Sequence, residues 1–495
     1  MNYLGKHINP FEMGTGSLKF LNWTVFIPVL FILCLFALFM AKTGVIGVAL
    51  CFTIVVTLIV VYAIFSRPRL GMFILIILGF IVNGLTRYVQ APVGLSIDVL
   101  IILLYLALFF KAFRYKVSWE KIKSPLTVVV TLWFGYIVLQ LANPEAQSIE
   151  AWFYAMRGFA MYQFMLIPLA LVVFSGPRDL SQFLIVWGIL SVLGTFKGIM
   201  QFKFGVDPFE QQWLDAGSDK THMLFGKLRV FSFYSDAGQF GAAQAHAGVV
   251  FGILALIKRV NLKLRIFFAT VALMGFFGMI LSGTRGAIAV PAMGGFMFLV
   301  LSKNIKVLAL GLLLGLGIYV FLAHTTIGQS NYEIRRMRTA FDPNDASLRV
   351  RLENQIRLKS YLASRPFGGG VGSTGNWGRR FTPHTFLANT ATDSWYVMIW
   401  ADTGIIGVIY YLTMILYILI VASYNVMVRI KDTEHKVLIM ALTCGFAGVI
   451  LASYGNGIIG QMPTGIIMYL SMVFMFASPN WGLENGKRSL LTNPL

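Results

Sequence analysis

The chain has 495 residues, a formal net charge of +20, 57% hydrophobic residues and 12% charged residues, and its mean hydropathy is +0.75. This hydropathy excludes a soluble globular domain, because apolar runs long enough to cross a bilayer recur along most of the sequence. The cysteines lie inside these runs, which excludes a disulfide framework, and no nucleic-acid-binding motif is present. We therefore expect an all-α, polytopic transmembrane helix bundle.

The apolar runs predict about 12–14 membrane spans, because a span needs roughly 20 consecutive apolar residues. The ranges are 22–41, 44–65, 70–85, 93–113, 125–142, 153–174, 181–202, 237–257, 265–282, 286–301, 305–323, 394–421, 436–456 and 462–478.

The distribution of Lys and Arg predicts the orientation of the chain. The short loops on one side carry most of these residues, whereas the short loops on the other side carry only Lys42, Arg87 and Arg285. Lys and Arg accumulate in cytoplasmic loops, so we expect a multi-pass membrane protein with both termini in the cytoplasm. The inner cations are expected to contact membrane lipids with anionic headgroups.

The longest polar segment, residues 324–393, is expected on the outer, periplasmic face. It carries ten Lys and Arg against five Asp and Glu. Asp345 or Ser347 is a candidate cap for a helix that runs to about Ala363 and ends before Pro366. The expected division is a transmembrane bundle over 1–323, the helical outer loop over 324–393, and a C-terminal part with spans and a cytoplasmic tail over 394–495.

Two arginines lie where apolar spans meet polar sequence. Arg157 lies a few residues from the outer end of its span and is either functional or directed toward the membrane interface. Arg285 lies in Ser282-Gly-Thr-Arg-Gly286, which interrupts two apolar runs. A guanidinium beside the free amides of a helix start suits a phosphate group, so Arg285 is a candidate anion-binding residue.

Several motifs resemble those of the O-antigen ligase and polymerase superfamily of bacterial envelope glycosyltransferases. Residues 282–286 are similar to that family's Ser-Gly-Ser-Arg-Gly element. Arg351, followed fifteen residues later by Pro366-Phe-Gly-Gly-Gly-Val-Gly372, resembles its outer-loop signature. The run from Asp402 to Gly407 resembles its acidic-x-Gly-x-x-Gly element. The resemblance covers about residues 190–410.

The resemblance implies a metal-independent enzyme with no cofactor, similar to the C-type glycosyltransferases. Its donor would be an undecaprenyl-pyrophosphate-linked glycan, its acceptor a glycan or the lipid A core, and its partners other polysaccharide assembly proteins. The implied pyrophosphate-binding residues are Arg285 and Arg351, with Arg157 as a third candidate. Aromatic side chains near the loop either bind the glycan or form an interfacial belt; those assigned to the glycan are Trp377, Trp395 and Tyr396.

The acid-base residue departs from the family pattern. Family ligases commonly carry His-Asn about eleven residues before the Gly-x-x-Gly element, where this chain has Asp393-Ser394. His384 lies nine residues earlier, so Asp393 and His384 are both candidate catalytic residues, and Asp393 is preferred by position. Family polymerases vary more at this place, which favours a polymerase over a ligase.

Three alternatives to a polymerase remain open. An O-antigen ligase or a protein O-glycosyltransferase would differ only in the acceptor. A lipid-linked glycan transporter or flippase would have a similar number of spans, but its substrate groups would lie deep in the bundle. The crowding of charge at the outer surface favours an enzyme that acts at the outer leaflet.

Overall fold

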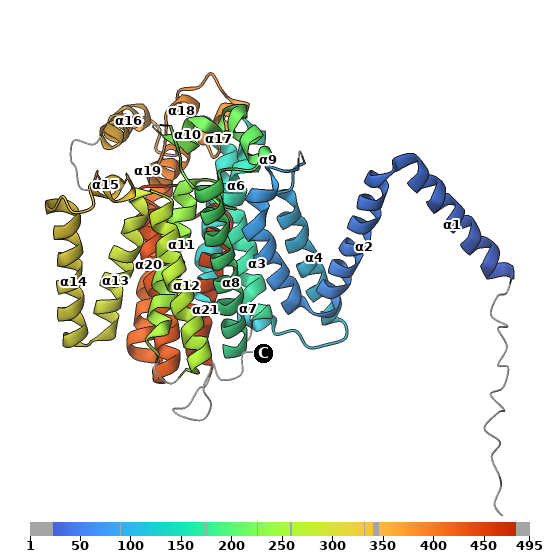
Figure 1. Cartoon of the computed structure of the whole chain (residues 1–495), viewed down its shortest axis with the longest axis horizontal. Coiled ribbons are helices and arrows are strands. Elements are labelled where there is room, and N and C mark those ends of the chain that lie inside the picture. Colours follow the sequence, from blue (N-terminus) through green and yellow to red (C-terminus); the bar gives the residue numbers. More distant parts are fainter. Residues whose placement is uncertain are drawn as a thin grey trace, which may run out of the picture. The chain divides into compact units, whose positions relative to one another are not determined.

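A computed structural model describes residues 23–89, 91–174, 176–224, 226–257, 260–330, 332–339 and 346–481. Contacts group the chain into two compact units, residues 1–63 and 64–495. The first unit contains α1 (Trp23–Thr43) and most of α2 (Val45–Ser66), which are two apolar helices. The second unit contains the end of α2 and all other elements (Figure 1).

Every predicted span contains a helix in the structure. In the second unit the long helices are α3 (Pro68–Leu85), α4 (Leu95–Ala112), α5 (Pro125–Leu139), α6 (Ile149–Met156), α7 (Tyr162–Val173), α8 (Pro177–Phe204), α11 (Ala237–Ala255), α12 (Leu262–Leu281), α13 (Ala289–Ser302), α14 (Ile305–His324), α19 (Trp395–Tyr424), α20 (Thr433–Ala452) and α21 (Thr464–Ala477). In the described residues, 9 helices are long and apolar enough to cross a membrane. A helix forms its backbone hydrogen bonds within itself, and this is required in lipid, which offers no hydrogen-bond partners. The predicted all-α polytopic architecture is confirmed.

Short helices connect or extend the long ones. The π-helix η3 (Arg157–Met161) joins α6 to α7, and the remaining short segments are η1 (Trp119–Ile122), η2 (Gln140–Ala142), η5 (Arg285–Ile288), η7 (Asn425–Arg429) and η8 (Ser478–Asn480). The π-helix η3 matters for the site, because such helices frequently mark functional positions.

The two long polar segments gather at one end of the second unit, the upper end in Figure 1. Residues 205–236 form α9 (Pro208–Trp213), η4 (Leu214–Ser218), α10 (Asp219–His222) and the antiparallel pair β1 (Met223–Leu224) and β2 (Lys227–Leu228). Residues 325–393 form α15 (Tyr332–Arg338), α16 (Ala346–Leu362), α17 (Gly375–Phe381) and α18 (Phe386–Asn389). The predicted helix ending near Ala363 is confirmed as α16, while the candidate cap Asp345 lies outside the described residues.

A buried arginine fixes the first of these polar segments. Arg87, which is 8% exposed, donates a hydrogen bond of 2.7 Å to the carbonyl of Ser232. Its guanidinium lies 4.7 Å from the ring centre of Trp213 and 4.3 Å from that of Phe231, within range of cation–π attraction. Glu210 supplies a carboxylate 3.9 Å away. The segment is thus held against the end of α3, and this places the residues that follow, including Ser235, at the cavity described below.

The core of the second unit is built around α11, which is buried along nearly its whole length. Its small residues let neighbouring helices approach closely, as is common between membrane helices. A Cβ on Gly275 of α12 would lie 2.7 Å from the carbonyl oxygen of Gln244 and from the amide of Gly248. The ring of His246 packs 4.8 Å from that of Trp187, as expected for a buried histidine in the core.

Candidate functional site

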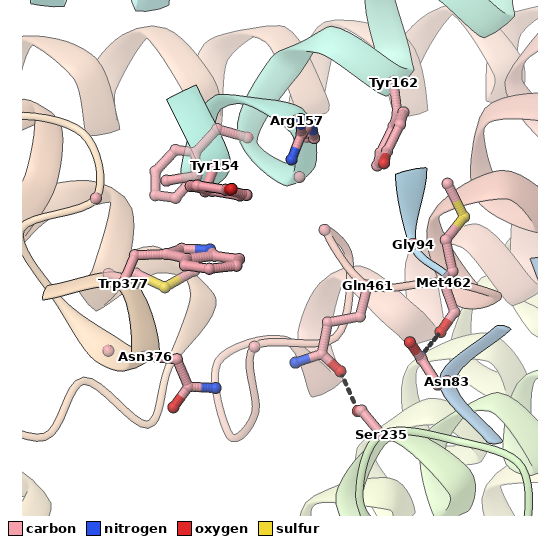
Figure 2. Close-up of a pocket in the computed structure, with 18 of the residues that line it drawn as sticks. Asn83, Gly94, Tyr154, Arg157, Tyr162, Ser235, Asn376, Trp377, Gln461 and Met462 are labelled. Atoms are coloured by element: carbon pink, nitrogen blue, oxygen red, sulfur yellow. Dashed lines mark hydrogen bonds between the residues drawn. The ribbon is translucent and has the colours of Figure 1, made fainter. Parts of the chain in front are cut away.

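A cavity of about 640 Å³ opens at the end of the unit that carries the polar segments. Its walls come from the end of α3, the start of α4, the junction of α6 with η3, residues 372–380, the start of α19, and the loop of residues 453–463 between α20 and α21. Figure 2 shows polar and aromatic side chains from these segments around one space. A volume of this size suits a small ligand or a few sugar units.

Arg157 lines this cavity at the start of η3. Its Nε lies 3.0 Å from Oδ2 of Asp98, and the two side chains are 13% and 17% exposed. Its guanidinium is also 4.6 Å from the ring centre of Phe153 and 5.1 Å from that of Tyr154. Arg157 is therefore placed at the cavity, with its side chain held by a carboxylate.

An aromatic platform consists of Tyr154 and Trp377, which line one wall of the cavity, and Phe381, which stacks on them. The rings of Tyr154 and Trp377 are stacked with centres 4.8 Å apart, and Figure 2 shows them nearly parallel. Phe381 stacks on Tyr154 at 5.6 Å, and the guanidinium of Arg380 lies 5.6 Å from the Tyr154 ring centre. Flat, rigid rings beside hydrogen-bonding groups are suited to the apolar face of a sugar. The predicted glycan contact Trp377 is therefore placed at the cavity together with a partner, Tyr154, that sequence reasoning missed.

Two glycine-rich motifs distant in sequence pack together and position Trp377. The carboxylate of Asp402, which is 1% exposed, accepts hydrogen bonds from the amides of Gly372 (2.8 Å) and Thr374 (3.1 Å). Gly404 has φ +70°, and a Cβ there would lie 2.0 Å from the carbonyl oxygen of Pro366. Only glycine combines that backbone conformation with so close an approach. Asp402 thus fixes the loop that leads into α17 and its Trp377.

We expect Asp402→Asn to lower both stability and activity. The asparagine side chain keeps one oxygen that accepts from one of the two backbone amides. Its NH₂ group faces the other backbone N–H, which is then buried without an acceptor, at a cost of about 1–3 kcal/mol. Limited proteolysis should then cut residues 366–380 faster, and glycan transfer should fall. Asp432→Asn is the matched control, because Asp432 accepts from a backbone amide (His435, 2.8 Å) at the start of α20, far along the chain from this loop. Equal activity loss in both variants would contradict a specific role for Asp402.

Arg351 and Asp393, predicted separately as pyrophosphate ligand and base, form an ion pair. Nε of Arg351 lies 3.2 Å from Oδ2 of Asp393, and the side chains are 38% and 50% exposed. The pair borders a small hollow of about 40 Å³ that is also lined by Ser394 and Tyr454. Asp393 precedes Ser394, the N-cap of α19, so the same helix start supplies Asp393 to this hollow and Trp395 to the main cavity. The carboxylate is both oriented by a cation and accessible to solvent.

The predicted break at residues 282–286 is confirmed. The α12 helix ends at Leu281, Gly283 has φ +57°, and η5 begins at Arg285. Thr284 fixes the turn by donating its hydroxyl to the carbonyl of Ala237 at 2.9 Å. Nη1 of Arg285 donates 2.9 Å to the hydroxyl of Thr339, next to the end of α15. The segment that contains α15 therefore packs directly on the break that carries Arg285.

Residues 453–463 link these features, and sequence reasoning missed them. The carbonyl of Ser453 accepts from the amide of Trp395 at 2.9 Å, and Gly455 packs on Gly286. Gln461 accepts from the hydroxyl of Ser235 at 2.6 Å, as Figure 2 shows across the cavity from Trp377. The available signal was the cluster of Gly, Asn and Gln between two apolar runs. This loop joins the main cavity to the surroundings of Arg285 and of the Arg351–Asp393 pair.

The remaining predicted residues lie elsewhere. His384 is exposed, between α17 and α18, and does not line the main cavity or the hollow beside Asp393. Tyr396 donates its hydroxyl to the carbonyl of Ile450 at 2.7 Å and does not line the cavity either. Trp395 borders the cavity but is only 3% exposed, because it packs on Phe159 at 5.4 Å and on Gly460. Among the three predicted aromatic contacts, Trp377 is the one that lines the cavity and is partly exposed.

Comparison with known proteins gives one finding. Residues 269–412 match a family model described as O-antigen ligase. The matched range includes Arg285, Arg351, Asp393 and Asp402, so it covers the motif residues whose positions are described above. No curated protein matches the chain.

Proposed function

We propose that this chain is a polymerase-type glycosyltransferase. The match of residues 269–412 to a family model described as O-antigen ligase supports the O-antigen ligase and polymerase superfamily. The enzyme would move an undecaprenyl-pyrophosphate-linked glycan onto another glycan at the outer leaflet. The observation that carries this proposal is the Asp393 carboxylate, held 3.2 Å from Arg351 at the start of α19 and open to solvent. It occupies the family's acid-base position without the ligase histidine.

The proposed reaction uses this carboxylate as a general base. Asp393 accepts the proton of the acceptor hydroxyl, whose oxygen forms a bond to the anomeric carbon of the donor glycan. The bond from that carbon to the pyrophosphate oxygen breaks, and undecaprenyl pyrophosphate leaves with the electron pair. Proton transfer by a positioned base typically contributes about 10²–10⁴-fold to the rate.

Arginines stabilise the charge that develops on the leaving pyrophosphate in this proposal. Arg285 lies at a helix start, where backbone amides add to the attraction for an anion. Arg351 orients Asp393 in the structure, and its partly exposed guanidinium can share its hydrogen bonds with a pyrophosphate oxygen. Arg157 contacts the glycan or its phosphate at the main cavity, with its charge partly balanced by Asp98. Donors aimed at developing charge are usually the largest catalytic contribution.

The main cavity is the proposed glycan subsite. The stacked rings of Tyr154 and Trp377 would hold a sugar, while Asn376 and Gln461 supply amide groups for its hydroxyls. This cavity lies on the side of the bundle that Lys and Arg counts predict to be periplasmic. We accordingly propose a location in the inner membrane with both termini cytoplasmic.

Transfer is expected to continue in EDTA. Arginine side chains provide the positive charge that a metal ion provides in other glycosyltransferases, so the proposed reaction contains no step that a chelator removes. The measurement is the initial rate of transfer by the purified protein with and without excess EDTA, expected to agree within about twofold. An EDTA-sensitive rate that a divalent cation restores would contradict metal independence.

The glycan profile of a deletion strain tests the proposal against its nearest alternatives. Loss of a polymerase leaves single repeat units on the lipid A core, whereas loss of a ligase leaves polymer on its lipid carrier with none attached. A protein O-glycosyltransferase mutant would instead change glycosylated proteins. We expect the first result, and it should be reversed by the intact gene but not by an Asp393→Asn variant.

A further inference from the structure

A second cavity, of about 980 Å³, lies at the opposite end of the same bundle. The directions of two helices establish this. The first residues of α3 line the second cavity, while Val82 and Asn83 near its end line the first. In α4 the order is reversed, because Leu95 lines the first cavity and Lys111 lines the second. The second cavity is therefore separate from the proposed glycan site by the length of a membrane span.

The rim of this second cavity is strongly basic. It carries five cationic side chains and no carboxylate; the cations are Arg67, Arg69, Lys111, Lys116 and Lys121. Arg69 lies 3.5 Å from Asp179. The other four cations make no ion pair within the part of the chain that the structure describes. Several like charges around one space favour an anionic occupant, since an anion relieves their mutual repulsion.

The wall of this cavity is apolar. Leu70, Phe73 and Ile77 follow one another along one face of α3, and Leu70 and Ile77 are 44% and 42% exposed. Val172 of α7 and Ile185 of α8 continue the wall. The cavity therefore combines lysines with an exposed apolar helix face at the end of a membrane span. The lysines match the anionic headgroup of a phospholipid, and the apolar face matches its acyl chains.

We propose that this second cavity binds an anionic phospholipid, with its headgroup phosphate among Lys111, Lys116 and Lys121 and its acyl chains along α3. The apolar wall selects a lipid over a free phosphate ion, and the unpaired cations select an anionic lipid over a zwitterionic one. The site is independent of glycan transfer, because none of its lining residues belongs to the cavity or the motifs assigned to that reaction.

Native mass spectrometry of the purified full-length protein tests this proposal. The protein is titrated separately with phosphatidylglycerol, phosphatidylcholine and inorganic phosphate. The wild type should retain phosphatidylglycerol in preference to the other two. Each cation near a membrane surface contributes a factor of about five in affinity, so the triple Lys→Gln variant at 111, 116 and 121 should bind phosphatidylglycerol roughly 100-fold more weakly.

The matched control is a triple Lys→Gln variant at positions 263, 306 and 431, which are exposed lysines at the same end of the bundle, two in the first turns of α12 and α14 and one between η7 and α20. It should bind phosphatidylglycerol like the wild type. The single variant Lys116→Gln, with about a fivefold loss expected, replaces the triple variant if that does not fold. Equal loss in the control, no preference for the anionic lipid in the wild type, or equally tight retention of inorganic phosphate would each overturn the proposal.

Discussion

Arg285→Ala is expected to reduce glycan transfer by about 10²–10³-fold, the usual effect of removing one donor from a developing oxyanion. The guanidinium lies at the break between α12 and α13, where the start of η5 adds backbone amides. It donates a hydrogen bond of 2.9 Å to the neutral hydroxyl of Thr339, a weaker attraction than the one it would have for an anionic pyrophosphate. The measurement is the initial transfer rate, normalised to the amount of folded protein in the membrane.

The control for this variant is Arg357→Ala, which removes an exposed arginine from α16. It should retain wild-type activity, because Arg357 lies outside the assigned site. Arg285→Lys should recover only part of the rate, since an ammonium group cannot bind a phosphate in the bidentate geometry of a guanidinium. Wild-type transfer by Arg285→Ala would contradict the role of this residue at the pyrophosphate.

Asp393→Asn is expected to reduce transfer by about 10²–10⁴-fold, the range attributed to a general base. Asparagine keeps the size of the side chain and a hydrogen-bond acceptor for Arg351, but it cannot accept the proton of the acceptor hydroxyl. His384→Gln should remain close to wild type, because His384 is exposed between α17 and α18 and does not line the main cavity or the hollow beside Asp393.

Two further results separate catalysis from loop positioning at Asp393. Arg351→Ala should lower the rate and allow residues 346–362 to be cut faster in limited proteolysis, because it removes the hydrogen bond to residue 393 that asparagine at that position still accepts. Asp393→Asn should lower the rate without that structural change. If Asp393→Asn keeps near-normal turnover while His384→Gln is inactive, histidine is the base. If both variants are active, neither residue transfers the proton.

Local sequence patterns predicted the local structure well. Apolar runs identified the helices of the bundle. A membrane helix is encoded by one continuous apolar stretch, and its backbone hydrogen bonds form within that same stretch. Pro366 and the glycines after it marked the end of α16, and Ser282-Gly-Thr-Arg-Gly286 marked the break before α13. Each of these signals is carried by consecutive residues.

The assembly of the site could not be predicted, because it depends on contacts between segments far apart in the sequence. The sequence indicated neither the ion pair of Arg351 with Asp393 nor that of Arg157 with Asp98. Tyr154 could be identified as part of an aromatic platform only once α17 was placed beside it. Residues 453–463 looked like a short connection, although the side chain of Gln461, the carbonyl of Ser453 and the packing of Gly455 join three parts of the site.

Reconstitution of the purified protein with an undecaprenyl-pyrophosphate-linked repeat unit as the sole substrate tests the central claim most directly. A polymerase uses this lipid as both donor and acceptor. The account predicts carrier-linked glycans of increasing length, with one undecaprenyl pyrophosphate released for each repeat added. Unchanged substrate, combined with transfer as soon as lipid A core is supplied, would contradict the claim and identify a ligase.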